Sequence, residues 1–146
     1  MKNNKPGFTL IELLVVIAII GLLSTLSILA LNTARARARD AKRISDVKQI
    51  QTALEMYYND MSDYPATASI APGLPIFSSN GTFLRQIPAP PQPIDGTLCP
   101  AANAYTYTRD VSAQGAATYT IKYCLGATIN TVTGNEMQTA TPAGVQ

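Results

Sequence analysis

Few residues in this chain of 146 have the types and spacing that catalysis requires, and histidine is absent. Covalent and acid–base catalysis need a nucleophile, a base and a group that orients the base. The carboxylates occur singly, in turns and on a polar helix, so no such set is visible. These acids are Asp40, Asp46, Asp60, Asp63, Asp95, Asp110 and Glu136. We therefore predict that the protein is not an enzyme and uses no cofactor.

Asp60 and Asp63 could offer oxygen ligands to calcium, which prefers carboxylates. No acid-rich loop surrounds them, and a frayed helix end with solvated carboxylates is the favoured interpretation. We therefore predict no metal site.

One carboxylate differs from the others because it lies in an apolar run. Residues 8–31 contain Glu12 as their only charged side chain. About 24 residues of helix span about 36 Å, and the hydrocarbon core of a bilayer is about 30 Å thick. A charge at the centre of a membrane helix costs roughly 2.5 to 3.5 kcal/mol, and less near its end. We therefore expect residues 8–31 to cross a membrane and Glu12 to have a partner.

A cleavable secretory signal is the competing interpretation, with Lys2 and Lys5 in its basic leader. The apolar region of such a signal is about 7 to 15 residues long and precedes a small-residue cleavage site. Here the run is longer and leads directly into a charged helix. This pattern favours a cut before the apolar run rather than after it.

The leader, residues 1–7, and the sequence Phe8-Thr9-Leu10-Ile11-Glu12 resemble the class III signal of type IV pilins and of type II secretion pseudopilins. The resemblance rests on the basic leader, the glycine at the cut, the phenylalanine after it and the acid four residues on. It implies cleavage between Gly7 and Phe8 by a prepilin peptidase and N-methylation of the Phe8 amine. It also implies assembly into a helical filament, in which Glu12 matches the glutamate at the fifth mature position.

The same resemblance implies a single-pass protein of the cytoplasmic membrane, with its leader in the cytoplasm and its head outside. This protein later joins an extracellular or periplasmic filament. Its partners are then copies of itself and related pilins, the prepilin peptidase, an inner-membrane assembly platform, and membrane lipid before assembly. A type IV pilus and a type II secretion pseudopilus both stay open. The alternative is an uncleaved single-pass membrane protein whose head binds an external ligand.

The helix is expected to continue through residues 32–64 as an amphipathic segment, because no proline occurs between Gly7 and Pro65. Tyr64 precedes that proline, and a residue before proline avoids the helical region. An apolar stripe recurs at spacings of three and four residues and should carry the head. It consists of Val47, Ile50, Leu54, Tyr57 and Met61.

The remaining sequence predicts a connecting loop and a small β-rich head, so the fold class is α+β: a pilin-like long helix packed on an antiparallel sheet. Residues 65–98 are rich in proline and glycine, with a turn at Asn80-Gly81-Thr82 and a short helical turn at Phe83, Leu84 and Ile87. Residues 99–146 form the head. Alternating β-branched and aromatic residues predict a hairpin, 105–109 with 118–125, and a third strand near 136–141.

Cys99 and Cys124 resemble the distal disulfide of many pilins. Two reduced, buried thiols are the alternative, and an exported head favours the disulfide.

A basic cluster follows the apolar run and consists of Arg35, Arg37, Arg39, Lys42 and Arg43. By the positive-inside rule this cluster would keep the head in the cytoplasm. The pilin resemblance places the head outside, and we follow the more specific motif. We interpret the cluster as a solvated helix face that contacts anionic headgroups or acids of neighbouring subunits, and we expect no nucleic acid partner.

Overall fold

The computed structural model describes residues 7–96, 98–99, 104–111, 117–129 and 132–145. The chain forms two compact units, residues 1–35 and 36–146. Of the predicted leader only Gly7 belongs to the described part of the chain.

Helix α1 (Leu10–Met61) is 52 residues long and belongs to both units. Its first part is apolar and long enough to cross a membrane. All side chains from Gly7 to Arg35 are exposed. The few hydroxyl groups of this part bond back to the helix: Ser24 donates to the carbonyl of Ile20, and Ser27 donates to that of Leu23. These bonds satisfy polar groups that lipid could not hydrogen-bond.

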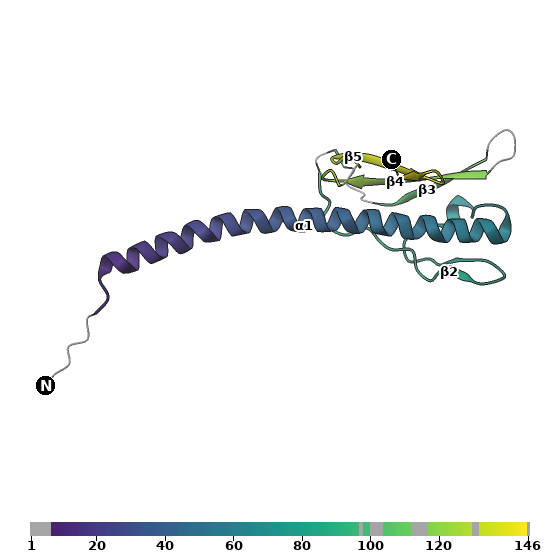
Figure 1. Ribbon diagram of the computed structural model, residues 1–146. Helices are drawn as coiled ribbons and strands as arrows, with labels where there is room; N and C mark the ends of the chain where they lie inside the picture. The colour runs from purple at the N-terminus through teal and green to yellow at the C-terminus, as the bar shows by residue number, and fades with distance from the viewer. Residues whose placement is uncertain (1–6, 97, 100–103, 112–116, 130–131, 146) are drawn as a thin grey trace. The chain divides into compact units, whose positions relative to one another are not determined.

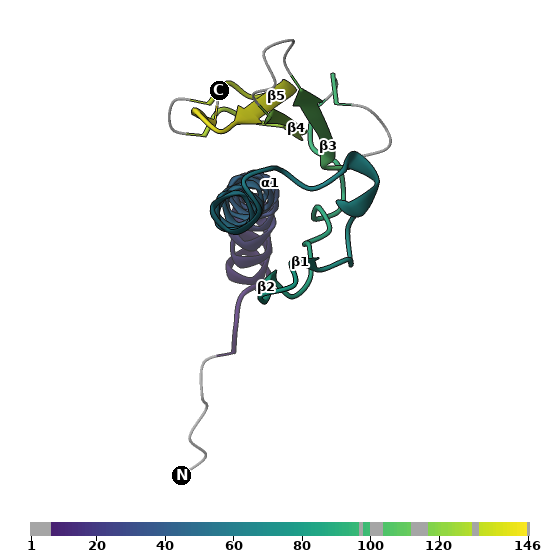
Figure 2. The same ribbon diagram turned by 90° about the vertical axis from the view of Figure 1, so that its right-hand side faces the viewer.

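The second unit contains a four-stranded antiparallel sheet in the order β3-β4-β5-β6, and a small hairpin formed by β1 and β2. In Figures 1 and 2 the larger sheet lies on one side of α1, and the hairpin lies on the opposite side. The elements are η1 (Thr67–Ser69), β1 (Ile76–Phe77), β2 (Thr82–Leu84), β3 (Thr106–Val111), β4 (Ala117–Leu125), β5 (Glu136–Thr141) and β6 (Gly144–Val145).

The α+β prediction is confirmed. The predicted hairpin of 105–109 with 118–125 corresponds to β3 and β4, and the predicted third strand corresponds to β5. β3 pairs with β4, with Tyr107 opposite Ile121, and β4 pairs with β5, with Tyr123 opposite Gln138. Residues 112–116, between the two strands of the predicted hairpin, lie outside the described residues.

Residues 65–98, predicted as a connecting loop, also contain η1, β1 and β2. The helical turn expected at Phe83, Leu84 and Ile87 is wrong, because the first two lie in β2. A tight turn at Asn80-Gly81 precedes that strand, and the N–H of Ser78 donates to the Gly81 carbonyl across it at 2.8 Å. The turn residues thus reverse the chain into a hairpin. The spacing of Phe83, Leu84 and Ile87 alone did not indicate this.

The core lies between α1 and β4. Val47, Ile50 and Leu54 of the helix stripe are at most 1% exposed. The inner face of β4 is equally buried and consists of Tyr119, Ile121, Tyr123 and Leu125. The prediction for Met61 is wrong: it is 46% exposed, because α1 ends there and Ser62 takes a left-handed conformation with φ 55°. Left-handed residues are common just beyond a helix end.

Replacing Leu54 by alanine tests this packing. Leu54 is fully buried between α1 and the sheet, so Leu54→Ala should lower the free energy of unfolding by about 2 to 5 kcal/mol. The measurement is denaturant unfolding of the detergent-solubilised chain, followed by the circular dichroism of its tyrosines. Met56→Ala on the exposed side of the same helix should change stability by less than about 0.5 kcal/mol. Equal losses in the two variants would contradict the assignment of the core.

Candidate functional site

The predicted cleavage site lies just before α1. Gly7, Phe8 and Thr9 have no regular secondary structure, and the Phe8 side chain is 85% exposed. Exposed, non-helical segments are the ones that proteases reach most readily. The Gly7–Phe8 bond is therefore positioned for cleavage without unwinding of the helix.

Thr9 and Glu12 form a reciprocal cap at the start of α1. The Thr9 N–H and hydroxyl donate to Glu12 Oε2 at 2.8 and 2.7 Å, and the Glu12 N–H donates to Thr9 Oγ1 at 3.3 Å. This is the capping box, in which two otherwise unpaired backbone N–H groups are satisfied. This role of Thr9 was not predicted, although the spacing Thr-x-x-Glu is the sequence signature of a capping box.

Cys99 and Cys124 are joined by a disulfide in the structure, with their Cα atoms 5.7 Å apart. Cys124 lies in β4 and is buried, whereas Cys99 lies in the connection and is half-buried. The bond therefore fixes the end of the connection against the central strand of the head.

Beside the disulfide is an ion cluster that we call the Asp95 cluster: Arg39, Asp40, Arg43 and Asp95. Arg39 donates to both carboxylate oxygens of Asp95, from Nε at 2.7 Å and from Nη2 at 2.6 Å. Arg43 reaches the same carboxylate with Nη1 at 3.3 Å and also pairs with Asp40. Two arginines from successive turns of α1 thus hold one carboxylate from the connection.

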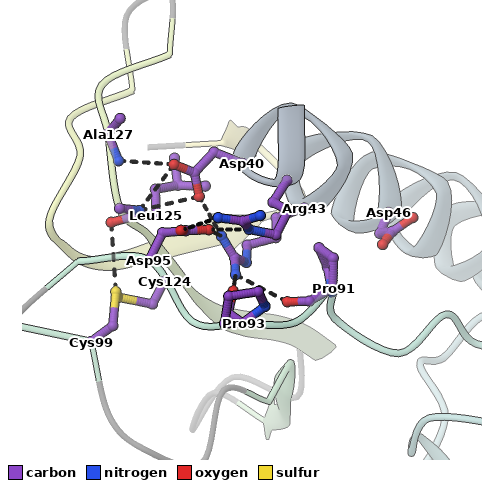
Figure 3. A network of polar contacts seen from close by, with 12 residues as sticks. Asp40, Arg43, Asp46, Pro91, Pro93, Asp95, Cys99, Cys124, Leu125 and Ala127 are labelled. Atoms are coloured by element: carbon purple, nitrogen blue, oxygen red, sulfur yellow. Dashed lines mark hydrogen bonds and ion pairs between the residues drawn. A yellow bond between two sulfur atoms is a disulfide. The ribbon is translucent and has the colours of Figure 1, made fainter. Parts of the chain in front are cut away.

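Arg43 and Asp40 are almost completely buried, with 1% and 0% exposure. Arg43 Nη2 donates to the carbonyls of Pro91 and Pro93 at 3.0 and 3.1 Å. Asp40 accepts the N–H of Ala127 at 2.9 Å and that of Gly126. Figure 3 shows these side chains pointing toward one another from α1, the connection and the loop after β4.

The interpretation of the basic cluster as a solvated face is therefore wrong for Arg39 and Arg43, which bind residues of their own head. The view of Asp40 and Asp46 as acids on a solvated helix is also wrong, since both are buried. Proline lacks an N–H and the 88–93 segment forms no strand. Its carbonyls therefore need donors from elsewhere, and Arg43 supplies them.

Charge pairing sets the ionisation of the cluster. Hydrogen bonds from Arg39 hold the pKa of Asp95 below its usual value, and burial only partly opposes this effect. The same contact raises the pKa of Arg39. Asp95 therefore stays ionised at neutral pH.

Asp60 and Asp63 each bind protein groups. Asp60 accepts the Ser78 hydroxyl and the Asn80 amide, and these bonds lower its pKa, that from Ser78 most strongly. Asp63 pairs with Arg109 at 2.6 Å. The expected solvated helix end is thus wrong for Asp60. Across the part of the chain that the structure describes, no group of three or more potential metal ligands occurs.

The head also has an open hollow of about 270 Å³ beside η1 and β1. Tyr57, Ser69, Ile70 and Phe77 are among its lining residues. Its lining contains the hydroxyls of Tyr57 and Ser69 but, among the described residues, no carboxylate, amine or imidazole beside them that would activate a hydroxyl.

Asp95→Asn tests the ion cluster through its pH dependence. The folded-state pKa of Asp95 is below the unfolded value of about 3.9, so its contribution is complete above that value and is lost as the pH falls through the folded pKa. The variant should be less stable at pH 7, and the difference should shrink between about pH 4 and pH 2. Acid unfolding of the two chains, followed by circular dichroism, measures this convergence.

Asp110→Asn is the matched control. Asp110 is exposed and accepts one hydroxyl, from Thr120. Asp110→Asn should leave the free energy of unfolding at pH 7 within about 0.5 kcal/mol of the wild-type value. If Asp95→Asn were as mild as this control, the cluster would add nothing to the stability of the head.

Residues 2–28 match the family model of the prokaryotic N-terminal methylation motif. The chain is 36% identical over 98 residues to the type II secretion system core protein G of Escherichia coli (strain K12), covering 61% of this chain and 68% of that protein. The protein of the same name from Dickeya chrysanthemi is 34% identical over 93 residues, covering 64% of this chain and 55% of that protein. The protein of the same name from Klebsiella michiganensis is 32% identical over 100 residues, covering 62% of this chain and 70% of that protein. No solved structure matches the chain significantly.

These relatives are core proteins of a secretion system rather than enzymes, in agreement with the prediction that this chain is not an enzyme. Their names also favour a pseudopilin over a type IV pilin. The identity to the Escherichia coli protein, over two thirds of its length, agrees with the methylation motif at the N-terminus. The chain therefore belongs to the pilin and pseudopilin family.

Proposed function

We propose that the protein is a structural subunit of a type II secretion pseudopilus, held in the cytoplasmic membrane by residues 8–31 before it joins the filament. The exposed apolar part of α1 carries this proposal, because every side chain from Gly7 to Arg35 is exposed. So large an apolar surface is not stable in water and has to be covered. Lipid covers it before assembly, and the helices of neighbouring subunits cover it in the filament.

Processing precedes assembly in this proposal. A prepilin peptidase cuts between Gly7 and Phe8, and the new Phe8 amine is methylated. The open segment before α1 favours this cut, and the match to the methylation motif covers the cleavage site.

The first test is the mass of the mature chain. In cells with an active prepilin peptidase, the purified protein should begin at Phe8 and carry one additional methyl group. Intact-mass and N-terminal peptide mass spectrometry measure both changes, and cells without the peptidase provide the control. An uncleaved chain in both strains would contradict the proposal and favour the membrane protein with a ligand-binding head.

Glu12 is proposed to set the register of assembly. Both contacts from Thr9 reach Oε2, so the capping box leaves Oε1 free for a second donor. Cleavage creates a positive amine at Phe8, and the amine of an adjacent subunit can approach Oε1 without unwinding either helix. An unpaired charge in an apolar environment is costly and pairing recovers much of that cost, so a subunit is favoured at the depth where this pair forms.

Glu12→Gln tests the pairing, since it removes the charge and keeps the size of the side chain. It should leave membrane insertion, cleavage and the unfolding of the head unchanged and strongly reduce filament yield. Thr9→Ala is the matched variant, because it weakens the cap by about 1 kcal/mol but keeps the carboxylate. Sedimented filaments, quantified against total subunit, provide the measurement.

Two results would contradict the pairing mechanism. One is wild-type filament yield in Glu12→Gln. The other is an equal loss in Thr9→Ala and Glu12→Gln, which would show that the cap at the start of the helix, rather than the charge, controls assembly.

A further inference from the structure

We propose that the Cys99–Cys124 disulfide is a redox latch that keeps the Asp95 carboxylate paired with Arg39 and Arg43. The oxidation state of the two cysteines then decides whether these two arginines of α1 are covered. The inference concerns the head alone and is independent of processing and of filament assembly.

The covalent bond and the ion cluster form one closed circuit of contacts. Asp95 lies four residues before Cys99. The disulfide joins Cys99 to Cys124. Two residues after Cys124, the N–H of Gly126 donates to Asp40 of α1. Asp40 pairs with Arg43, which in turn reaches Asp95.

The two segments joined by the disulfide also touch directly through their backbones. A Cβ built on Gly126 would lie 2.4 Å from the Asp95 Cβ and 2.6 Å from the Asp95 carbonyl carbon. Gly96 has φ +95°, and a Cβ built on it would lie 3.3 Å from Cys99 Sγ. Both positions therefore need glycine. The disulfide fixes this close approach, and the approach places the Asp95 carboxylate.

Besides the disulfide, the segment around Asp95 is held by Arg43, which binds the carbonyls of Pro91 and Pro93, and by the Leu98 N–H, which donates to Asn135 Oδ1 at 3.2 Å. The described part of the connection from Pro88 to Cys99 forms no helix or strand. Arg43 carries a buried charge whose carboxylate partners are Asp40 and Asp95. Removing one partner from a buried ion pair is strongly unfavourable, so a released connection also frees Arg43 to leave its buried position. Reduction thus acts on the cluster through the position of one carboxylate.

The chemistry of opening is thiol–disulfide exchange with a dithiol reductant. One reductant thiolate attacks a sulfur of the disulfide, the S–S bond breaks, and the other cysteine leaves as a thiolate that takes up a proton. The second reductant thiol then displaces the first cysteine. The head gains two electrons and two protons, and the dithiol becomes a disulfide. Cys99 is half-buried and Cys124 is buried, so attack is easier at Cys99. A disulfide oxidant reverses the sequence.

Opening uncovers two arginines of the basic cluster. In the oxidised head Arg43 is 1% exposed, and the side chain of Arg39 is 22% exposed. In the reduced head both join Arg35 and Arg37, which are exposed already. The latch therefore converts a largely paired helix segment into a strongly basic one.

Chemical labelling of the full-length chain in detergent tests the latch, because phenylglyoxal modifies exposed arginine side chains and does not require the helix to unfold. With the disulfide intact, labelling of Arg39 and Arg43 should be slow, since both are paired and Arg43 is buried. Reduction with a dithiol should accelerate it about tenfold or more, since labelling follows the population of the open state. Arg37, which is exposed on the same helix, provides the internal control and should change by less than about twofold. Peptide mass spectrometry separates the sites.

Reoxidation with oxidised glutathione should restore the protection. The double variant Cys99→Ser/Cys124→Ser should behave like the reduced chain and ignore the reductant. Asp95→Asn with the disulfide intact should expose Arg39, because the bond then has no carboxylate to position.

Two outcomes would overturn the latch. In the first, Arg39 and Arg43 stay protected in the reduced chain. In the second, labelling of Arg109, which lies in strand β3 and pairs with Asp63, rises by the same factor as labelling of Arg39, which would make the disulfide a general stabiliser of the head. Both readings come from the reduced wild-type chain, so they do not depend on whether the serine variant folds.

Discussion

The packing of one stripe of α1 on one face of β4 is the interaction on which the head depends. Leu54 and Tyr123 are completely buried in this layer. Tyr64 and Tyr119 extend it with an edge-to-face contact of their rings. β4 is central because β3 and β5 pair with it on either side, so a shift of its register would move its apolar face away from the helix. The ion cluster and the disulfide then act on segments that this layer has already brought close.

The parts of the fold with a short sequence period were predictable. A helix stripe repeats every three or four residues and a strand face every second one, so α1, β3, β4 and β5 could be predicted without knowledge of distant contacts. The hairpin of β1 and β2 has two and three residues per strand, too few for a period to show. Its turn, Asn80-Gly81, carried the stronger signal. The cap formed by Thr9 and Glu12 also has a local sequence signature, Thr-x-x-Glu, and its partners are three residues apart.

The Asp95 cluster could not be predicted, because Asp95 is far in the sequence from its partners on α1. Arg43 and Asp95 are separated by 52 residues, and the intervening connection has no periodic pattern that fixes its path. Composition favoured solvated charges, which is the usual outcome for a basic helix segment. The buried position of Arg43 follows instead from its contacts with Asp95 and the proline carbonyls, which exist only in the folded head.

These contacts also bear on the proposed topology, in which a basic cluster follows the membrane helix and the head lies outside. The positive-inside rule applies to the chain during insertion, when the arginines and lysines are unpaired. In the folded head Arg39 pairs with Asp95, Lys42 with Asp46 and Arg43 with Asp40. Asp40 and Asp46 are close in sequence and can offset part of the charge early. Asp95 arrives only when the connection folds back. In the proposed topology the cluster therefore opposes export of the unfolded chain more than it affects the folded one, and folding of the head outside the membrane would make its transfer harder to reverse.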